Sequence, residues 1–267
     1  MLNNITFGQY FPADSFVHKM DARFKLLMTF ALIVFAFVAF NFASLGLVAV
    51  FTVFVLLLTK IPLKMYFRTL KTIFIFILIS AVLNIFYVTD GTLLFSYGII
   101  RIYTGGILRA VFVAVRIVLL ILISAVLTYT TTPTSLTDAI ESLLKPLSKI
   151  GIDTHTFAMM MTIALRFIPT LIEETDKIMS AQKARGADME NGGLIKKIKS
   201  VIPILIPLLV SSIRRAKELA DAMECRCYHG GKGRTRLKVL KAGRRDVVAT
   251  ISVCVLLTGI ILLNIFI

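Results

Sequence analysis

The sequence has few residues of the kinds that build disulfide scaffolds and metal centres. It contains three cysteines and three histidines among 267 residues. Because the number of cysteines is odd and their spacing matches no disulfide framework, a disulfide scaffold is excluded. Cys225, Cys227 and His229 alternate along the chain, but they supply only three ligands and lack the usual spacing of zinc sites. We therefore expect no metal site in this chain.

The sequence also lacks the residue patterns of an enzyme. His18, His155 and His229 are scattered, and no nucleophile lies near them in the sequence. The stretch HGGKGRTR at 229–236 contains glycines and a lysine. It lacks the G-x-x-x-x-G-K-S/T spacing of a phosphate-binding loop, and it follows a predicted helix instead of a strand. The sequence thus predicts a protein that is not an enzyme and binds no cofactor itself.

Acidic residues are scarce as well, with 15 Asp and Glu against 30 Lys and Arg and a net charge of +15. Hydrophobic residues make up 57% of the chain, compared with roughly 45–50% in a soluble domain. This composition predicts a membrane protein whose charge is gathered in loops or in a polar region. The anionic leaflet, the positive-inside bias and an acidic protein partner account for the basic excess, so we expect no nucleic-acid partner.

Five apolar runs are long enough to cross about 30 Å of hydrocarbon, which takes about 20 helical residues. The first follows basic residues, as in a signal peptide, but a second run comes at once and no small-residue cleavage site separates them. We expect it to be retained. The sequence predicts an all-α polytopic membrane protein with about five transmembrane helices, at 24–41, 44–60, 70–88, 106–129 and 247–267.

Basic residues in the loops predict the orientation of the chain. The loop NFAS between the first two runs carries no charge, whereas the loop at 60–71 holds four basic residues, Lys60, Lys64, Arg68 and Lys71. Because basic loops stay in the cytoplasm, the second loop and the N-terminus are predicted to be cytoplasmic and the C-terminus outside.

Two further apolar runs, 156–172 and 201–213, are short and interrupted by proline. If both crossed the membrane, the basic residues between them, such as Lys177 and Lys199, would lie outside, against the positive-inside bias. We therefore predict that this part of the chain stays on the cytoplasmic side. The predicted domains are a transmembrane region at 1–129, a cytoplasmic region at 130–245 and a C-terminal transmembrane helix at 246–267.

The fourth run contains two arginines, Arg109 and Arg116. An arginine at mid-bilayer costs about 3 kcal/mol, which the many apolar residues of this run outweigh. Arg109 can extend toward the near membrane face. Arg116 is predicted to face protein, in a packing or interfacial role, with an ion pathway as the alternative.

The predicted cytoplasmic region begins with TTPTSLTDAIESLLKPL at 131–147, which predicts a short amphipathic helix with Ser135 or Thr137 as its N-cap. Two long helices follow, at 156–184 and 201–227. Each would be about 40 Å long and so would extend into the cytoplasm. The second carries a 3.5-residue seam that predicts packing against a partner helix, formed by Ile206, Leu209, Ile213, Ala216, Ala220 and Met223.

The two long helices end in similar stretches, AQKARG at 181–186 and AMECRC at 222–227, offset by 41 residues. In each, arginine follows alanine by four residues and precedes a small residue. The chemistry of helix ends accounts for one such stretch, because arginine suits the last turn and glycine the position after it. Two matched ends favour a second interpretation, in which Arg185 and Arg226 dock onto two matched receptors.

Four stretches occur in the order TTPTSLTDAIESLLKPL, ALRFIPTLIEE, AQKARG and AMECRCY. Together they resemble the transmembrane T component of energy-coupling factor transporters, a vitamin and metal-ion uptake family related to ABC importers. The resemblance covers nearly the whole chain, and its specific motifs lie within 130–228.

The resemblance implies a membrane scaffold and a cytoplasmic coupling region whose two long helices cross. Their Ala-Arg-Gly signatures would enter grooves on two ATPase subunits, which bind ATP and Mg, while a separate membrane S component captures the substrate. The first signature matches in full. In the second, Cys225 stands where the family usually has alanine, and Cys227 stands where it often has glycine. The implied coupling residues are Ala184, Arg185, Gly186, Cys225, Arg226 and Cys227.

Three other functions remain as alternatives. A stand-alone secondary transporter would use Arg116 and Arg166 as pathway charges, but inverted repeats and mid-membrane carboxylates are missing. The permease of a conventional ABC importer would couple through one short helix instead of two long ones. A membrane-bound enzyme would depend on the alternating Cys225, Cys227 and His229.

Overall fold

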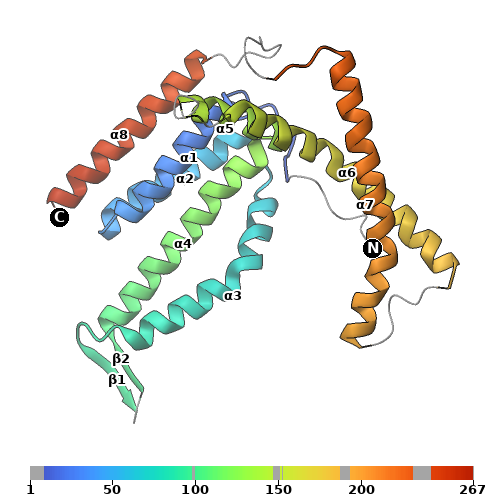
Figure 1. Ribbon diagram of the computed structural model, residues 1–267. Helices are drawn as coiled ribbons and strands as arrows, with labels where there is room; N and C mark the ends of the chain where they lie inside the picture. The colour runs from blue at the N-terminus through green and yellow to red at the C-terminus, as the bar shows by residue number, and fades with distance from the viewer. Residues whose placement is uncertain are drawn as a thin grey trace. The chain divides into compact units, whose positions relative to one another are not determined.

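The computed structural model describes residues 9–97, 100–146, 151, 153–186, 193–230 and 242–266. Most of the glycine-rich stretch at 229–236 lies outside the described residues. The chain divides into two compact units, one formed by Gly8–Ala139 with Val239–Ile267 and the other built on Ile140–Lys238. We call them the bundle unit and the long-helix unit. Both are helical, apart from one short hairpin in the bundle unit (Figure 1).

The bundle unit contains the five apolar runs, and each is a helix. The structure thus confirms the all-α class. The helices are α1 (Ala22–Val38), α2 (Phe42–Thr59), α3 (Leu63–Tyr87), α4 (Thr104–Thr130) and α8 (Arg244–Phe266).

Five helices of the described chain are long and apolar enough to cross a membrane, but they are not the five expected. They are α2, α3, α4, α8 and α6 (Thr154–Ala184). The first predicted span, α1, has 17 residues, at the short end of the range of about 17–25 for a spanning helix. Because α1 packs among α2, α4 and α8, we treat it as part of the membrane bundle.

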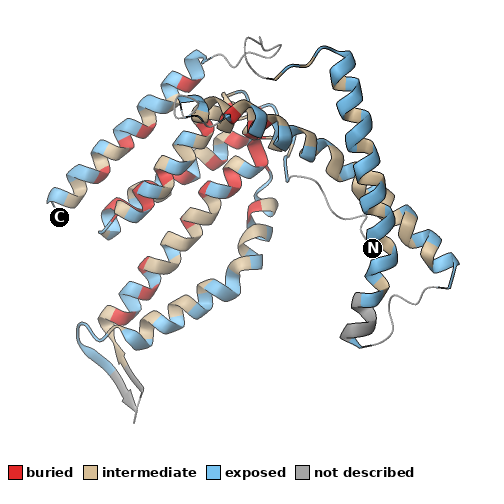
Figure 2. Ribbon diagram, in the orientation of Figure 1, coloured by how far each residue is buried: buried red, intermediate tan, exposed pale blue. Residues whose placement is uncertain are grey.

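The core of the bundle unit lies where α1, α2, α4 and α8 meet. Ala36, Val48 and Ile260 are fully buried there, and Leu119 and Ile123 of α4 complete the contact. The outward faces of these helices are also apolar, and Figure 2 shows α3 largely exposed, with Tyr66 as its one buried residue. Helices that are apolar on every side are typical of a membrane bundle, where lipid covers the outer faces.

The connection from α3 to α4 contains a two-stranded antiparallel hairpin that the sequence did not predict, β1 (Leu93–Tyr97) and β2 (Ile100–Tyr103). Two glycines permit the close approach of the helices beyond it. A Cβ atom on Gly105 would lie 2.3 Å from the carbonyl oxygen of Asp90, and one on Gly106 would lie 2.9 Å from that of Ile85.

The boundary between the units falls within α5 (Pro133–Leu144). The N-cap of this helix is Thr132, whose Oγ1 accepts a hydrogen bond from the backbone of Ser135 at 3.3 Å. The prediction of Ser135 or Thr137 as the cap was therefore wrong. Proline at the first helical position explains the difference, since its fixed φ favours a helix start at Pro133 itself.

The long-helix unit contains α6 and α7 (Leu194–Cys225). Asp153 caps α6, accepting hydrogen bonds from the backbone of Thr156 at 3.2 Å and from its hydroxyl at 2.6 Å. These bonds to the ionised form lower the pKa of Asp153. His155 Nδ1 lies 3.0 Å from Glu141 Oε1, which links α6 to the end of α5. The ends of α6 and α7 agree with the sequence, but α7 begins earlier than expected.

Candidate functional site

The two long helices cross and run antiparallel (Figure 1). Glu174 of α6 contacts α7 through Ser211, which donates a hydrogen bond to Glu174 Oε1, and through Arg215, whose Nη2 lies 2.8 Å from Glu174 Oε2. Further along α6, Gln182 Nε2 donates to the carbonyl oxygen of Pro203 at 3.4 Å. Later residues of α6 thus meet earlier residues of α7.

The contact at Pro203 follows from the proline pattern of α7. A helix residue normally donates its N–H to the carbonyl four residues earlier, but Pro207 has no N–H to offer to Pro203. The side chain of Gln182 supplies the missing donor. Because Gln182 belongs to the stretch AQKARG, this contact lies close to the end of α6.

The first arginine-containing end closes α6 with a glycine in the left-handed region. Arg185 is the C-cap, and its N–H donates to the carbonyl of Ala181 at 3.2 Å. Gly186 follows with φ +86°, and its N–H donates to Lys183 at 3.0 Å. A Cβ on Gly186 would meet no atom within 4 Å. Glycine is therefore favoured by backbone conformation and not by crowding.

The second end has the same backbone arrangement without the glycine. Arg226 is the C-cap of α7, and Cys227 follows with φ 55°. The N–H of Cys227 donates to the carbonyl oxygen of Glu224 at 2.8 Å, and the N–H of Tyr228 donates to the carbonyl oxygen of Met223 at 3.0 Å. These two bonds define a Schellman motif. Cysteine thus occupies the left-handed position that Gly186 occupies at the other end, so the departure seen in the sequence leaves the backbone motif intact.

The structure brings the predicted coupling residues together into two separate groups, one at each helix end. All six are exposed: Ala184, Arg185 and Gly186 at the end of α6, and Cys225, Arg226 and Cys227 at the end of α7. Arg185 lies eleven residues beyond Glu174, and Arg226 lies eleven residues beyond Arg215. Each arginine is therefore about 16 Å along its helix from the crossing contact, on opposite sides.

The seam residues of α7 fall into two groups. Ile206, Leu209 and Ile213 are 56%, 57% and 62% exposed. Ala216, Ala220 and Met223 line a cavity of about 430 Å³ between α6 and α7. The packing of this seam against a partner helix stays a prediction.

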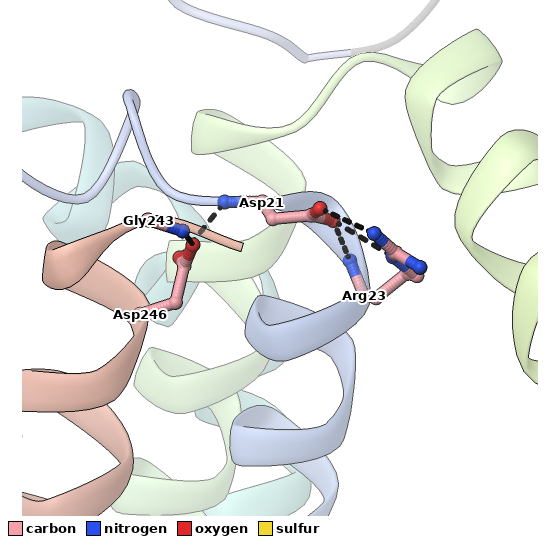
Figure 3. Close-up of polar contacts among 4 residues, drawn as sticks. All are labelled: Asp21, Arg23, Gly243 and Asp246. Atoms are coloured by element: carbon pink, nitrogen blue, oxygen red, sulfur yellow. Dashed lines mark hydrogen bonds and ion pairs between the residues drawn. The ribbon is translucent and has the colours of Figure 1, made fainter. Parts of the chain in front are cut away.

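Sequence reasoning missed a polar cluster that joins α1 to α8 (Figure 3). The buried carboxylate of Asp246 accepts hydrogen bonds from the backbone of Asp21 at 3.0 Å and of Gly243 at 2.8 Å. Asp21 in turn pairs with Arg23, at 3.0 Å between Oδ2 and Nη2. Burial by itself raises the pKa of Asp21, but the hydrogen bonds from Arg23 outweigh it and hold the pKa below its ordinary value.

Lys25 is a second buried charge that the sequence indicated only as part of a basic flank. It is 6% exposed, and its Nζ donates to the carbonyl of Thr130 at 2.9 Å, to that of His18 at 3.3 Å and to Thr131 Oγ1 at 3.4 Å. An ammonium at the C-terminal end of α4 suits the helix dipole. The starts of α1 and α8 therefore lie beside the end of α4, at one end of the bundle unit.

Arg116, at the middle of α4, and Asn264 contact the other end of α1. Arg116 Nη2 donates to the carbonyl of Ala39 at 2.6 Å, and its guanidinium carbon lies 4.6 Å from the ring centre of Phe112. Asn264 Nδ2 donates to the carbonyl of Val38 at 2.8 Å. Both side chains thus satisfy carbonyls where α1 ends. This geometry favours the packing role of Arg116 over an ion pathway.

Comparison with known proteins decides the family. Residues 13–237 match the family described as Cobalt transport protein, CbiQ. A protein of Clostridium kluyveri named "Energy-coupling factor transporter transmembrane protein EcfT" is 53% identical over 258 residues, which cover 96% of this chain and 95% of that protein. A protein of Bacillus subtilis with the same name is 42% identical over 256 residues, covering 96% and 97%. The chain belongs to the EcfT family.

Membership in the EcfT family confirms the resemblance drawn from the four stretches. The relatives are named as transmembrane components of energy-coupling factor transporters, and the apolar helices agree with a multi-pass membrane protein. These names favour a transporter component over a membrane enzyme. Within the described part of the chain, Cys225, Cys227 and His229 form no group that could hold a metal ion.

Proposed function

We propose that this EcfT-family chain couples two ATPase subunits to a substrate-binding S component for vitamin or metal-ion uptake. The observation that carries the proposal is the pair of exposed arginines, Arg185 and Arg226, on the same backbone motif at the ends of two crossed helices. In the described residues, neither guanidinium makes an ion pair or hydrogen bond, so each is available to a carboxylate or a group of carbonyls on a partner.

The placement of the two ends supports two ATPase receptors and not one. The helices run antiparallel, and the arginines lie about 16 Å from the crossing contact on opposite sides. A single compact groove could not hold both ends. ATP and Mg would be bound by the two ATPases, and the energy for motion would come from the different contacts that their two nucleotide states make with the helix ends.

The bundle unit supports the proposed orientation. Asp21 and Asp246 join the starts of α1 and α8, and Lys25 joins them to the end of α4. The hydroxyl of Tyr129, near the end of α4, also forms a hydrogen bond with the hydroxyl of Thr69, within the basic stretch at 60–71. This end of the bundle carries the basic loop and would face the cytoplasm. The N-terminus would then be cytoplasmic and the C-terminus outside, with α6 and α7 on the cytoplasmic side.

The test is capture of ATPase subunits by the purified chain in detergent. Arg185→Ala and Arg226→Ala should each weaken capture, and the double variant should lose most of it. Arg214→Ala removes an exposed arginine elsewhere on α7 and serves as the matched control. If the folded double variant captured ATPases as the wild type does, the two arginines would be ordinary helix ends and the coupling site would lie elsewhere.

A further inference from the structure

Glu174 is held to α7 by both of its carboxylate oxygens. Oε1 accepts from the hydroxyl of Ser211, and Oε2 lies 2.8 Å from Nη2 of Arg215. Ser211 and Arg215 are four residues apart and so lie on the same face of α7, one turn from each other. Because Oε2 is shielded from solvent, removing its cation would leave that oxygen without a charged partner. We call Glu174, Ser211 and Arg215 the crossing clamp.

The crossing clamp lies at the same distance from both arginine ends. Glu174 precedes Arg185 by eleven residues, and Arg215 precedes Arg226 by eleven residues. The 41-residue offset between the two stretches is thus also the offset between the two clamp residues. A change in crossing angle about this contact would therefore move both ends by the same amount.

Two other features lie between the helices among the described residues. The cavity of about 430 Å³ lies between α6 and α7 on the side toward Arg226, lined by Ile163, Phe167 and Leu171 of α6 and by Leu219 of α7. On the other side, the contact from Gln182 to Pro203 is exposed and 3.4 Å long. The crossing clamp thus lies between an open cavity on one side and a weak hydrogen bond on the other.

We propose that Glu174 is a positioning residue whose clamp with Ser211 and Arg215 acts as the pivot of the two coupling helices. The clamp fixes the point of crossing, and the two ends move about it together when the ATPases change state. This role rests on the proposed coupling function. It predicts that loss of the clamp uncouples the motion of the two ends while each arginine keeps its own receptor.

The first experiment measures the distance between the two helix ends in the purified chain. Spin labels are attached to cysteines introduced at Ala181 and Ala222, both exposed, after the native cysteines are changed to serine. Pulsed electron–electron double resonance should give one narrow distance distribution for the wild type. Glu174→Gln and Arg215→Gln should broaden it at least twofold, and the exchange Glu174→Arg with Arg215→Glu should narrow it again.

Glu173→Gln is the matched control, because this exposed neighbour has the same charge and lies outside the clamp. It should leave the distribution unchanged. Unchanged distributions in both single clamp variants would overturn the pivot. An exchange variant that stays as broad as the single variants would also overturn it, since only a specific pair is rescued by exchanging its charges.

The second experiment repeats the distance measurement on the complex with ATPase subunits, before and after a non-hydrolysable ATP analogue is added. The wild type should shift from one narrow distance distribution to another. Glu174→Gln should still capture both ATPases but give a broad distribution in both states. A shift in Glu174→Gln as narrow as that of the wild type would overturn the pivot. Failure of the proposed function gives a different result, because ATPase capture would then survive the double change at Arg185 and Arg226.

Discussion

At the scale of single residues, Cys227 holds a left-handed backbone conformation that glycine adopts at lower cost. Its φ of 55° satisfies the same helix-end motif that Gly186 satisfies at φ +86°. A non-glycine residue in this region costs about 1–2 kcal/mol. The end of α7 therefore carries a local strain that the end of α6 does not.

The first prediction concerns these two positions. Cys227→Gly should raise the free energy of unfolding by about 1 kcal/mol, and Gly186→Ala should lower it by a similar amount. Cys225→Gly is the control, because Cys225 lies within the helix, where glycine brings no such gain. Thermal unfolding in detergent measures all three. A lower midpoint for Cys227→Gly would show that the thiol makes a contact worth more than the strain.

The second prediction follows from the lowered pKa of Asp21, whose ordinary value is 3.8. Because the folded state favours the ionised carboxylate, Asp21 stabilises the fold fully above its ordinary pKa and loses this effect as the pH falls through the folded value. Asp21→Asn should therefore lower the unfolding midpoint at pH 7, and the difference from the wild type should shrink below about pH 4.

Asp14→Asn is the control for that measurement, since the Asp14 side chain is 91% exposed and its pair with Lys19 lies at the surface. Surface pairs contribute little to stability, so this variant should match the wild type across the same pH range. A difference between Asp21→Asn and the wild type that stayed constant down to pH 2 would contradict the assignment.

At the scale of elements, local sequence predicted most of the helices and few of the contacts between them. The apolar runs and the long glycine-free stretch ending at Ala184 correctly placed the helices, because length and periodicity are local properties. The pairs Asp21 with Asp246 and Glu174 with Arg215 are separated by 225 and 41 residues. Nothing in the local pattern links such partners, so only the folded chain reveals the crossing clamp.

The third prediction is for the turn between α3 and α4. Gly105→Ala should destabilise the bundle, because the new Cβ would lie 2.3 Å from the carbonyl oxygen of Asp90 and would displace the segment after α3 from the start of α4. Gly46→Ala, within α2, places its Cβ where no atom lies within 4 Å and should raise stability by up to about 1 kcal/mol. Thermal unfolding of the two variants side by side would contradict this account if both gave the same change.

At the scale of the whole molecule, composition predicted a membrane bundle, but not which helices would meet the length of a span. The orientation drawn from loop charge stays a prediction. α1 has 17 residues and α6 has 31. The charge of the loops predicts which side of the membrane they lie on, but it does not predict the length of a helix. The predicted helix ends at Arg185 and Arg226 agree with the structure. Their equal spacing from Glu174 and Arg215 emerged only from the packing of α6 on α7.

The fourth prediction is the orientation of the bundle in the membrane. Single cysteines at Lys64 and Asp90, in a chain without native cysteines, should react differently with a membrane-impermeant maleimide applied to intact cells. The cysteine at 90 should be labelled and the cysteine at 64 should react only after the cells are opened. The reverse pattern would place the basic loop at 60–71 outside and overturn the orientation drawn from it.

The unequal chemistry of the two helix ends allows each to be followed separately. Exposed thiols flank Arg226 on both sides, at Cys225 and Cys227, whereas the stretch at 181–186 contains none. A partner that covers the end of α7 would shield these thiols from alkylation, and a partner on α6 alone would leave them reactive. Alkylation of the native thiols therefore reports whether a partner covers the end of α7, without any change to the sequence.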